Sequence, residues 1–227
     1  MFDRIAPRYD FLNRMLSFRQ DVAWRKRMAG MMPAGYNLRL LDIATGTADQ
    51  IISIMKSAPA VQSAIGVDMS EGMLDQGRDK IARLQWQDRV ALKTGDAMRI
   101  PEPDAGFDVA TMSFGIRNVI NVSEALREIR RVLKPGGRAL ILEFSTPANR
   151  LFRPLYFFYL RHVLPVIGGM LSGDRAAYAY LNKTIETFPS GEAFCALMRE
   201  AGFVQVGHRP LTFGIASIYY GDRAASA

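Results

Sequence analysis

The sequence predicts an α/β fold with a mostly parallel, doubly wound sheet, and three observations lead to this prediction. Between residues 40 and 144, short apolar runs alternate with amphipathic stretches. The runs are rich in Val, Ile, Leu and Phe, which are typical of buried strands. The chain has 227 residues, of which 49% are hydrophobic and 22% charged, an ordinary composition for one globular domain. We therefore expect a single domain over residues 1–227, with right-handed crossovers between its parallel strands.

The expected strands cover residues 39–44, 63–67, 90–94, 107–113 and 138–144. The clearest helix between them begins at Asn121 or Ser123, either of which can cap it, and a Lys-Pro-Gly-Gly turn at 134–137 ends it. The apolar face of this helix comprises Val122, Ala125, Leu126, Ile129, Val132 and Leu133. Another capped helix is expected at 190–201, and the runs at 203–208 and 213–221 predict a terminal hairpin.

Two segments do not fit the alternation, and both are basic. We expect residues 1–38 to form a helical N-terminal lid and residues 145–187 a helical, aromatic insert after the fifth strand. Residues 1–39 hold eight Lys/Arg and three acids, a net charge of +5, and residues 150–183 hold five and one, a net charge of +4. The chain carries +7 in total, so the remainder carries 7 − 9 = −2. A basic balance is compatible with nucleic acid, an anionic membrane or an acidic ligand, and its distribution here points to the two added segments.

Composition narrows the setting of the protein. A single cysteine, Cys195, excludes a disulfide framework. No signal-peptide pattern opens the chain, and the apolar stretch at 151–171 contains arginines and prolines that make it a poor membrane span. We expect a cytoplasmic protein.

The loop after the first strand predicts a ligand site. Residues 40–49 run from a strand through a small-residue turn with Gly46 and Thr47 into a helix. The G-x-G-x-x-G pattern for a pyrophosphate is absent, and Asp42 and Asp49 flank the turn. Because two carboxylates repel a pyrophosphate, the loop favours a neutral or cationic ligand.

Polar residues follow the next three strands as well. Asp68 ends the second strand, 22 residues after Gly46, where a carboxylate can accept hydrogen bonds from ribose hydroxyls. Asp96 and Ala97 follow the third strand, and Ser113 ends the fourth. An aspartate at one strand end is more often a helix cap than a ligand, but four such positions in order indicate one binding edge.

This pattern resembles the class I S-adenosylmethionine-dependent methyltransferases. The resemblance implies a Rossmann-like fold with a seven-stranded, mostly parallel sheet and an antiparallel last strand. It implies that Asp42 and Gly46 lie under the methionine part of S-adenosyl-L-methionine, that Asp68 holds the ribose, and that Asp96 and Ala97 contact the adenine. The full set of cofactor-binding residues that it implies is Asp42, Gly46, Thr47, Asp68, Met69, Asp96, Ala97 and Ser113, with no metal.

A narrower resemblance covers essentially the whole chain. It is to the ubiquinone/menaquinone-biosynthesis C-methyltransferases of the UbiE type, and its most specific motifs are Arg8-Tyr9-Asp10 and Phe114-Gly115-Ile116-Arg117-Asn118. The resemblance implies C-methylation of a polyprenylated quinol ring, with demethylmenaquinol as the main expected acceptor and a benzoquinol left open. It implies that Tyr9, Arg117 and Asn118 act together around a water. At Asp21, where the family commonly has histidine, the sequence departs from the pattern.

The two basic segments fit a lipid substrate. Aromatic and basic residues at 150–161 suit a helix at an anionic membrane surface, or else a lid that covers the lipid tail. We therefore expect a lipid quinol substrate and peripheral contact with the inner face of the cytoplasmic membrane. A homodimer, or an assembly with other quinone-biosynthesis enzymes, is compatible with the sequence.

Two other functions compete with this interpretation. A class I methyltransferase acting on nucleic acid commonly places an Asn/Asp-Pro-Pro-Tyr/Phe loop after the fourth strand, whereas residues 113–117 read Ser-Phe-Gly-Ile-Arg. We therefore expect no nucleic-acid partner, although another small-molecule acceptor stays open. The second alternative is a non-catalytic, membrane-associated assembly partner, which the cofactor aspartates disfavour.

Overall fold

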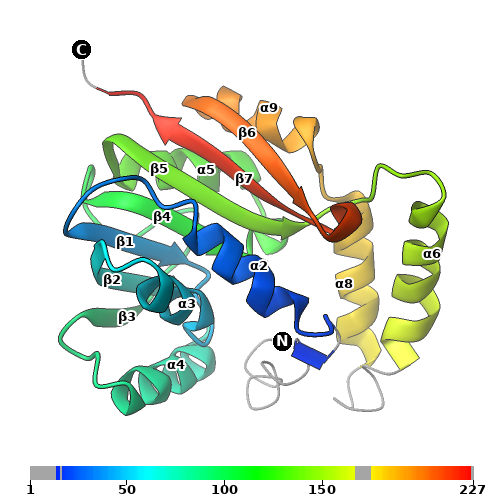
Figure 1. Cartoon of the computed structure of the whole chain (residues 1–227), viewed down its shortest axis with the longest axis horizontal. Coiled ribbons are helices and arrows are strands. Elements are labelled where there is room, and N and C mark those ends of the chain that lie inside the picture. Colours follow the sequence, from blue (N-terminus) through cyan, green and yellow to red (C-terminus); the bar gives the residue numbers. More distant parts are fainter. Residues whose placement is uncertain (1–13, 16, 167–174, 226–227) are drawn as a thin grey trace.

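The computed structural model describes residues 14–15, 17–166 and 175–225, with side chains left out at 175–180. Seven strands form one sheet in the order β3-β2-β1-β4-β5-β7-β6 (Figure 1). The strands are β1 (Leu38–Ile43), β2 (Val61–Asp68), β3 (Val90–Thr94), β4 (Phe107–Ser113), β5 (Leu133–Phe144), β6 (Phe203–Leu211) and β7 (Ala216–Arg223). The sheet confirms the α/β fold and the seven strands that the resemblance implied.

The helices of the fold alternate with the strands as expected. They are α2 (Gln20–Ala29), α3 (Asp49–Ser57), α4 (Glu71–Arg83), α5 (Val122–Val132), α6 (Phe152–Phe158), α8 (Arg175–Thr187) and α9 (Glu192–Glu200). Short 3₁₀ helices lie at η1 (Ile116–Asn118) and η3 (Thr212–Gly214), and a π-helix, η2 (Tyr159–Val163), continues α6. None of the helices in the described ranges is long and apolar enough to cross a membrane.

The directions of the strands are as predicted, whereas the start of β5 is not. Strands β1 to β5 pair in parallel, while β7 runs antiparallel to both β5 and β6. Strand β5 begins at Leu133 rather than at residue 138, because Leu133 already pairs with Phe107 before a shift in register. The expected turn survives inside this strand as a left-handed Gly136, with a φ of 78°.

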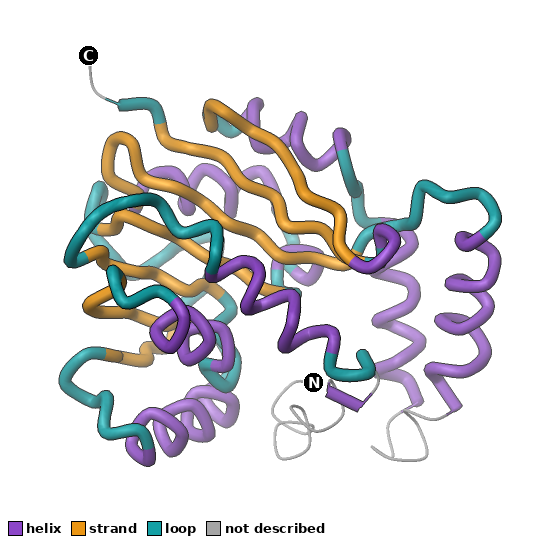
Figure 2. Tube along the Cα trace, viewed as in Figure 1, coloured by secondary structure: helices purple, strands orange, loops and turns teal. Residues whose placement is uncertain are grey.

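Helices lie on both faces of the sheet (Figure 2), and an apolar cluster fills the contact on each face. Helices α5 and α9 contribute Leu126, Ile129 and Phe194 to the first cluster. Helices α2 and α3 contribute Trp24, Met28 and Ile51 to the second. The chain changes from one face to the other between β3 and β4, so neighbouring strands β1 and β4 send their connections to opposite faces.

Helix starts agree with local chemistry in one case and differ in another. The Asn121 side chain caps α5 by accepting a hydrogen bond from the Glu124 amide at 3.1 Å, as the sequence predicts. Helix α9 instead begins after Gly191, whose left-handed φ of 63° lets the chain enter the helix without a side-chain cap.

The insert forms a helical unit at one end of the sheet. Helix α6 with η2 and helix α8 lie side by side there, as Figures 1 and 2 show. The Asn182 amide donates a hydrogen bond to the Leu160 carbonyl and links α8 to the π-helix. A small cluster of Tyr156, Leu160, Leu164 and Ile185 fills the contact between them. The helical insert of the prediction is therefore confirmed over its described part, and the N-terminal segment contributes α2.

Candidate active site

A pocket opens at the carboxyl ends of β1 and β4, where the direction of winding changes. In open α/β sheets this is the position at which ligands bind. Four of the predicted cofactor residues line the pocket, namely Asp42, Gly46, Thr47 and Ser113. The remaining lining residues are Asp21, Arg25, Ala44, Thr45, Asp49 and Gln50.

Asp42 ties the two strand ends together. Its side chain is 1% exposed, and its two oxygens accept hydrogen bonds from Thr45 at 2.7 Å and Thr111 at 2.5 Å. Thr45 lies in the loop after β1 and Thr111 on β4, so the carboxyl group fixes the floor of the pocket. Burial raises the pKa of Asp42 to about 6, although both hydroxyls oppose the shift.

The loop above Asp42 is held open. Gly46 has a left-handed φ of 54°, and a Cβ added there would meet nothing within 4 Å, so its backbone faces open space. Ala44 and Ala48 also have positive φ, at 51° and 63°, which costs energy for a residue with a Cβ. The Asp68 carboxylate accepts a hydrogen bond from the Gly46 amide at 2.8 Å and thereby holds the loop against β2.

The other predicted cofactor residues lie along the same edge but outside the lining of the pocket. Asp68 also accepts from the Ser70 amide, and Asp96 accepts from the Met98 amide, both at 2.9 Å. Met69 is 73% exposed, whereas Ala97 is buried. The cofactor roles of these residues stay predictions.

Helix α2 supplies two lining residues, Asp21 and Arg25, that the sequence reasoning did not assign to the site. They are one helical turn apart on the face that meets α3. Gln50 on α3 was missed as well; its side-chain oxygen accepts from Ser113 at 3.0 Å. The sequence shows that Asp21 and Arg25 are four residues apart and so lie on one face of a helix. This spacing does not reveal which element that face packs against.

These residues fit a cofactor that carries both charges of an amino acid and a sulfonium. Asp21, Asp42 and Asp49 give the pocket an acidic lining, and Arg25 adds one cation. The Arg25 Nε and Gln50 Nε2 atoms are buried without a hydrogen-bond partner. Buried polar atoms without partners are rare in folded proteins, so their presence beside the pocket is consistent with a polar ligand.

A buried ion pair lies immediately beyond the pocket. The Arg117 Nη1 atom on η1 donates to Glu143 at 2.7 Å and to the Phe114 carbonyl at 2.6 Å. The two side chains are 8% and 0% exposed. Burial raises the pKa of Glu143, and the neighbouring Arg117 opposes that shift. The role of Glu143 as the partner of Arg117 depends on the β4–β5 contact and was not predicted from the sequence.

Further buried polar atoms have no hydrogen-bond partner among the residues that the structure describes. They are Arg117 Nε, Asn118 Oδ1, Tyr156 Oη and Asn182 Oδ1. The structure therefore places the two described members of the predicted catalytic group, Arg117 and Asn118, directly after the strand that lines the pocket. Tyr9, the third member, lies outside the described residues.

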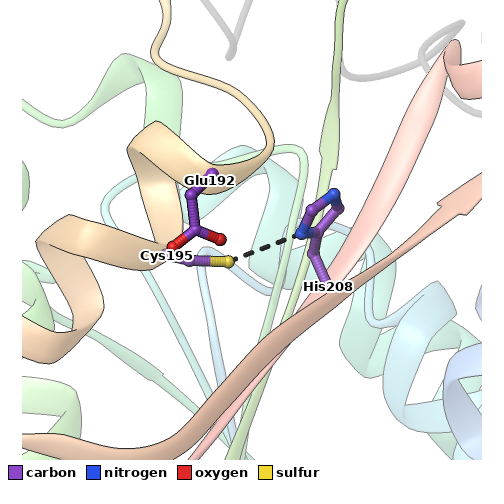
Figure 3. A group of neighbouring side chains, drawn as sticks. All are labelled: Glu192, Cys195 and His208. Atoms are coloured by element: carbon purple, nitrogen blue, oxygen red, sulfur yellow. Dashed lines mark hydrogen bonds between the residues drawn. The ribbon is translucent and has the colours of Figure 1, made fainter. Parts of the chain in front are cut away.

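One other group of side chains has the composition of a metal site. Glu192 and Cys195 on α9 face His208 on the edge strand β6 (Figure 3), with their ligand atoms within 4.8 Å of one another. The Cys195 sulfur already bonds His208 Nδ1 at 3.6 Å, and Glu192 pairs with Arg199. Burial raises the pKa of the Cys195 thiol, and Glu192 adds to the shift, which disfavours the thiolate that a metal requires. We interpret the group as a structural contact.

Known proteins resemble the chain over almost its full length. Residues 1–223 match the model of the ubiE/COQ5 methyltransferase family. A ubiquinone/menaquinone biosynthesis C-methyltransferase UbiE of Geobacter sulfurreducens is 50% identical over 98% of this chain and 87% of its own length. A demethylmenaquinone methyltransferase of Thermus thermophilus is 43% identical over 98% of this chain and 100% of its own.

Solved structures resemble the fold. A SAM-dependent methyltransferase of Thermotoga maritima, described as a possible histamine N-methyltransferase, has a TM-score of 0.68. It is 20% identical in sequence and covers 98% of this chain and 97% of its own. This similarity extends to the fold alone.

The first prediction concerns the contribution of the buried Arg117–Glu143 ion pair to stability. Arg117→Ala leaves Glu143 as an unpaired buried acid, so we expect a loss of about 3–5 kcal/mol in the free energy of unfolding. The double variant Arg117→Met/Glu143→Leu removes both charges and is expected to recover most of that loss. Urea denaturation measures both changes.

A matched control is Arg199→Ala, which breaks the exposed pair with Glu192 and is expected to cost less than about 1 kcal/mol. If Arg117→Ala were as mild as this control, or if the double variant were no more stable than Arg117→Ala, the buried pair would not have the assigned role.

Proposed function

The chain belongs to the ubiE/COQ5 methyltransferase family, and from that premise we propose that it C-methylates the ring of a polyprenylated quinol with S-adenosyl-L-methionine as methyl donor. The main reaction that we expect converts demethylmenaquinol to menaquinol. The Thermus thermophilus relative is named a demethylmenaquinone methyltransferase. The observation that carries the proposal is a donor and an acceptor on η1, Arg117 Nε and Asn118 Oδ1, that are buried without a partner in the described part of the chain, directly beyond the pocket at the end of β4.

The cofactor supplies a methyl group on a positively charged sulfur, whose bond electrons stay with the sulfur when the methyl leaves. The acidic lining of the pocket suits this cation, and Arg25 suits the carboxylate of an amino acid. Asp68, Met69, Asp96 and Ala97 lie along the same edge, which supports their proposed contacts with ribose and adenine. Thr47 adds a hydroxyl that accepts from Lys80 at 2.8 Å and keeps that cation near Asp49.

The residues of η1 are proposed to handle the acceptor ring. Arginine stays protonated at physiological pH, so Arg117 is suited to stabilising negative charge on a quinol oxygen rather than to removing a proton. Its Nη1 atom is engaged by Glu143 and Phe114, while its buried Nε has no hydrogen-bond partner among the described residues. Asn118 Oδ1 is an available acceptor. Loss of a proton from the quinol to water raises electron density on the neighbouring ring carbon, which then accepts the methyl group. This carbon next gives its own proton to water and the quinol oxygen takes a proton back, so that one proton is released overall.

Positioning is the other task of the site. Trp24, Phe114 and Phe144 form an aromatic group, with the Phe114 and Phe144 ring centroids 4.7 Å apart. The Arg117 guanidinium lies over the Phe144 ring at 5.3 Å. An apolar wall of this kind excludes water and holds a planar ring near a bound cofactor, which is a large source of rate. Tyr9 is proposed to act with Arg117 and Asn118 around a water.

The outer face of the insert is proposed to contact an anionic membrane surface. Leu151, Leu155 and Phe158 on or beside α6 are 90%, 63% and 58% exposed. Phe213 on η3 is 80% exposed, and its ring packs against Phe152 of α6. Arg150 and Arg153 flank this apolar surface and are exposed. Exposed apolar side chains bordered by arginines are typical of an interfacial surface, and a lipid quinol would reach the enzyme from there.

We predict that the protein methylates soluble short-chain demethylnaphthoquinol in the presence of S-adenosyl-L-methionine. Mass spectrometry would detect the mass gain of one methyl group. Because the methyl group is bound to carbon, it should stay on the product after treatment with acid or base. A paired assay with a short-chain benzoquinol decides the acceptor range. No methylation of either quinol by the full chain would contradict the proposed function.

The same assay tests the role of η1. Asn118→Ala is expected to lower turnover at least about tenfold, because it removes an acceptor that orients the ring. The affinity for cofactor should change less than about twofold, since Asn118 does not line the pocket. Normal turnover of this variant would remove Asn118 from the catalytic group.

Cofactor affinity is predicted to depend on pH through Asp42. A cationic ligand favours the ionised carboxylate, so affinity should rise as pH increases through about 6 and level off above it. The raised pKa has the opposite effect on the free protein: the contribution of Asp42 to stability is present below its unfolded pKa of 3.8 and is lost as pH rises through 6.

Titration calorimetry at pH 5 and pH 7.5 measures the affinity change. The variant Asp42→Asn should bind the cofactor more weakly at pH 7.5 and show a smaller difference between the two pH values. An equal affinity of the wild-type protein at both would contradict the prediction.

Membrane contact is predicted to depend on Arg150 and Arg153. Each basic residue near an anionic surface contributes roughly 1 kcal/mol, so Arg150→Gln/Arg153→Gln should weaken vesicle binding by roughly tenfold or more at low salt. Co-sedimentation with phosphatidylglycerol/phosphatidylcholine vesicles measures this. The control Arg83→Gln/Arg199→Gln removes two exposed arginines outside the insert and should bind normally. Equal vesicle binding by both double variants would reject the proposed surface.

A further inference from the structure

The Tyr156 hydroxyl is a buried polar group for which the described structure offers no partner. The residue is 5% exposed and lies on the inner side of α6, whereas Leu155 and Phe158 on the same helix are exposed. Its oxygen is one of the few buried side-chain polar atoms in the described residues that lack a hydrogen bond. Such an atom is costly to bury and calls for an explanation, such as a ligand that completes it.

Tyr156 faces the proposed acceptor site rather than the interior of the insert alone. Its apolar cluster includes Phe144, whose ring lies under the Arg117 guanidinium at 5.3 Å. Phe144 follows Glu143 on β5, and Glu143 forms the buried ion pair with Arg117, so the cluster that holds Tyr156 borders that pair. Burial raises the pKa of Tyr156 and keeps the phenol neutral, so it can donate a hydrogen bond.

Contacts between helices hold the part of the insert that carries Tyr156 in place. Helix α6 runs into the π-helix η2, an arrangement that is frequent at functional sites. Asn182 of α8 donates to the Leu160 carbonyl and fixes α8 against this π-helix. Helix α8 also contacts η1, which carries Arg117 and Asn118. Tyr156 therefore comes from a different element than η1 but is tied to it through α8.

We propose that the Tyr156 hydroxyl contacts the acceptor ring and donates a hydrogen bond to one quinol oxygen, so that α6 of the insert forms part of the methyl-acceptor site. This inference rests on the proposed function and names an additional substrate-binding residue for it. A quinol carries two oxygens at opposite ring positions, so a site for it requires polar groups from more than one direction. The donor on Arg117 and the acceptor on Asn118 come from η1, and Tyr156 adds a donor from the insert.

The decisive variant is Tyr156→Phe, which removes only the hydroxyl. With a soluble short-chain demethylnaphthoquinol, we expect kcat/KM for the quinol to fall at least about tenfold, while the cofactor affinity stays within about twofold. The melting temperature should stay the same or rise, because the lost hydroxyl has no partner in the ligand-free protein. A residue that only stabilised the fold would show the reverse combination.

The matched control is Tyr219→Phe. Tyr219 is also fully buried, but its hydroxyl accepts a hydrogen bond from the Gly191 amide at 2.8 Å. This variant is expected to lower the melting temperature and to leave kcat/KM for the quinol close to the wild-type value.

A chemical variant of the acceptor identifies the oxygen involved. The two monohydroxy naphthol analogues each lack one quinol oxygen. Only the analogue that keeps the hydroxyl next to the methylated carbon can react, so binding is compared instead of turnover. The ratio of the Tyr156→Phe to the wild-type Kd should approach one for the analogue that lacks the contacted oxygen and stay large for the other.

Three outcomes would overturn the inference. Tyr156→Phe could keep wild-type kcat/KM on the quinol, it could lower the melting temperature, or both analogues could give the same Kd ratio between variant and wild type. If the wild-type protein methylates no quinol, the proposed function fails and this inference fails with it; a fully active Tyr156→Phe variant beside an active wild-type protein contradicts only the inference.

Discussion

The structure depends most on the contact between the ends of β1 and β4. Connections from these neighbouring strands leave on opposite faces, so no helix covers the edge between them. Asp42 joins the two ends by accepting from Thr45 and Thr111 while almost fully buried. A buried carboxyl group is costly unless it is hydrogen-bonded. The same interaction therefore stabilises the strand ends and leaves an acidic floor for a cationic ligand.

The acceptor side is organised by a second buried carboxyl group, Glu143. Glu143 lies at the carboxyl end of β5. Its side chain pairs with Arg117, which lies in the short 3₁₀ helix after β4. Because Ser113 lines the pocket and the Phe114 carbonyl accepts a hydrogen bond from Arg117, only a few residues separate the pocket from the proposed acceptor site. The two sites are thus fixed relative to each other by one strand end, which is what a direct group transfer requires.

The helical additions complete the site from outside the sheet. Helix α2 packs on α3 and brings Asp21 and Arg25 to the pocket, while the insert brings Tyr156 toward Arg117. Both additions lie in the segments that carry the excess positive charge of the chain, +5 and +4. The basic balance therefore belongs to the parts proposed to receive a lipid substrate, and the sheet core with its acidic pocket is near neutral.

Sequence alone determined the strands, the ligand edge and the cofactor loop, because each follows from local properties. Apolar runs mark buried strands, and a small-residue turn with Gly46 after such a run marks the loop at its end. Only the tertiary structure decided which distant side chains meet: Glu143 with Arg117, Arg25 with the pocket, and Tyr156 with the acceptor side. These contacts depend on strand order and on how helices pack across the sheet, and the hydrophobic pattern constrains neither. The start of β5 at Leu133 was not predictable from local patterns for the same reason, because it depends on pairing with Phe107 across the sheet.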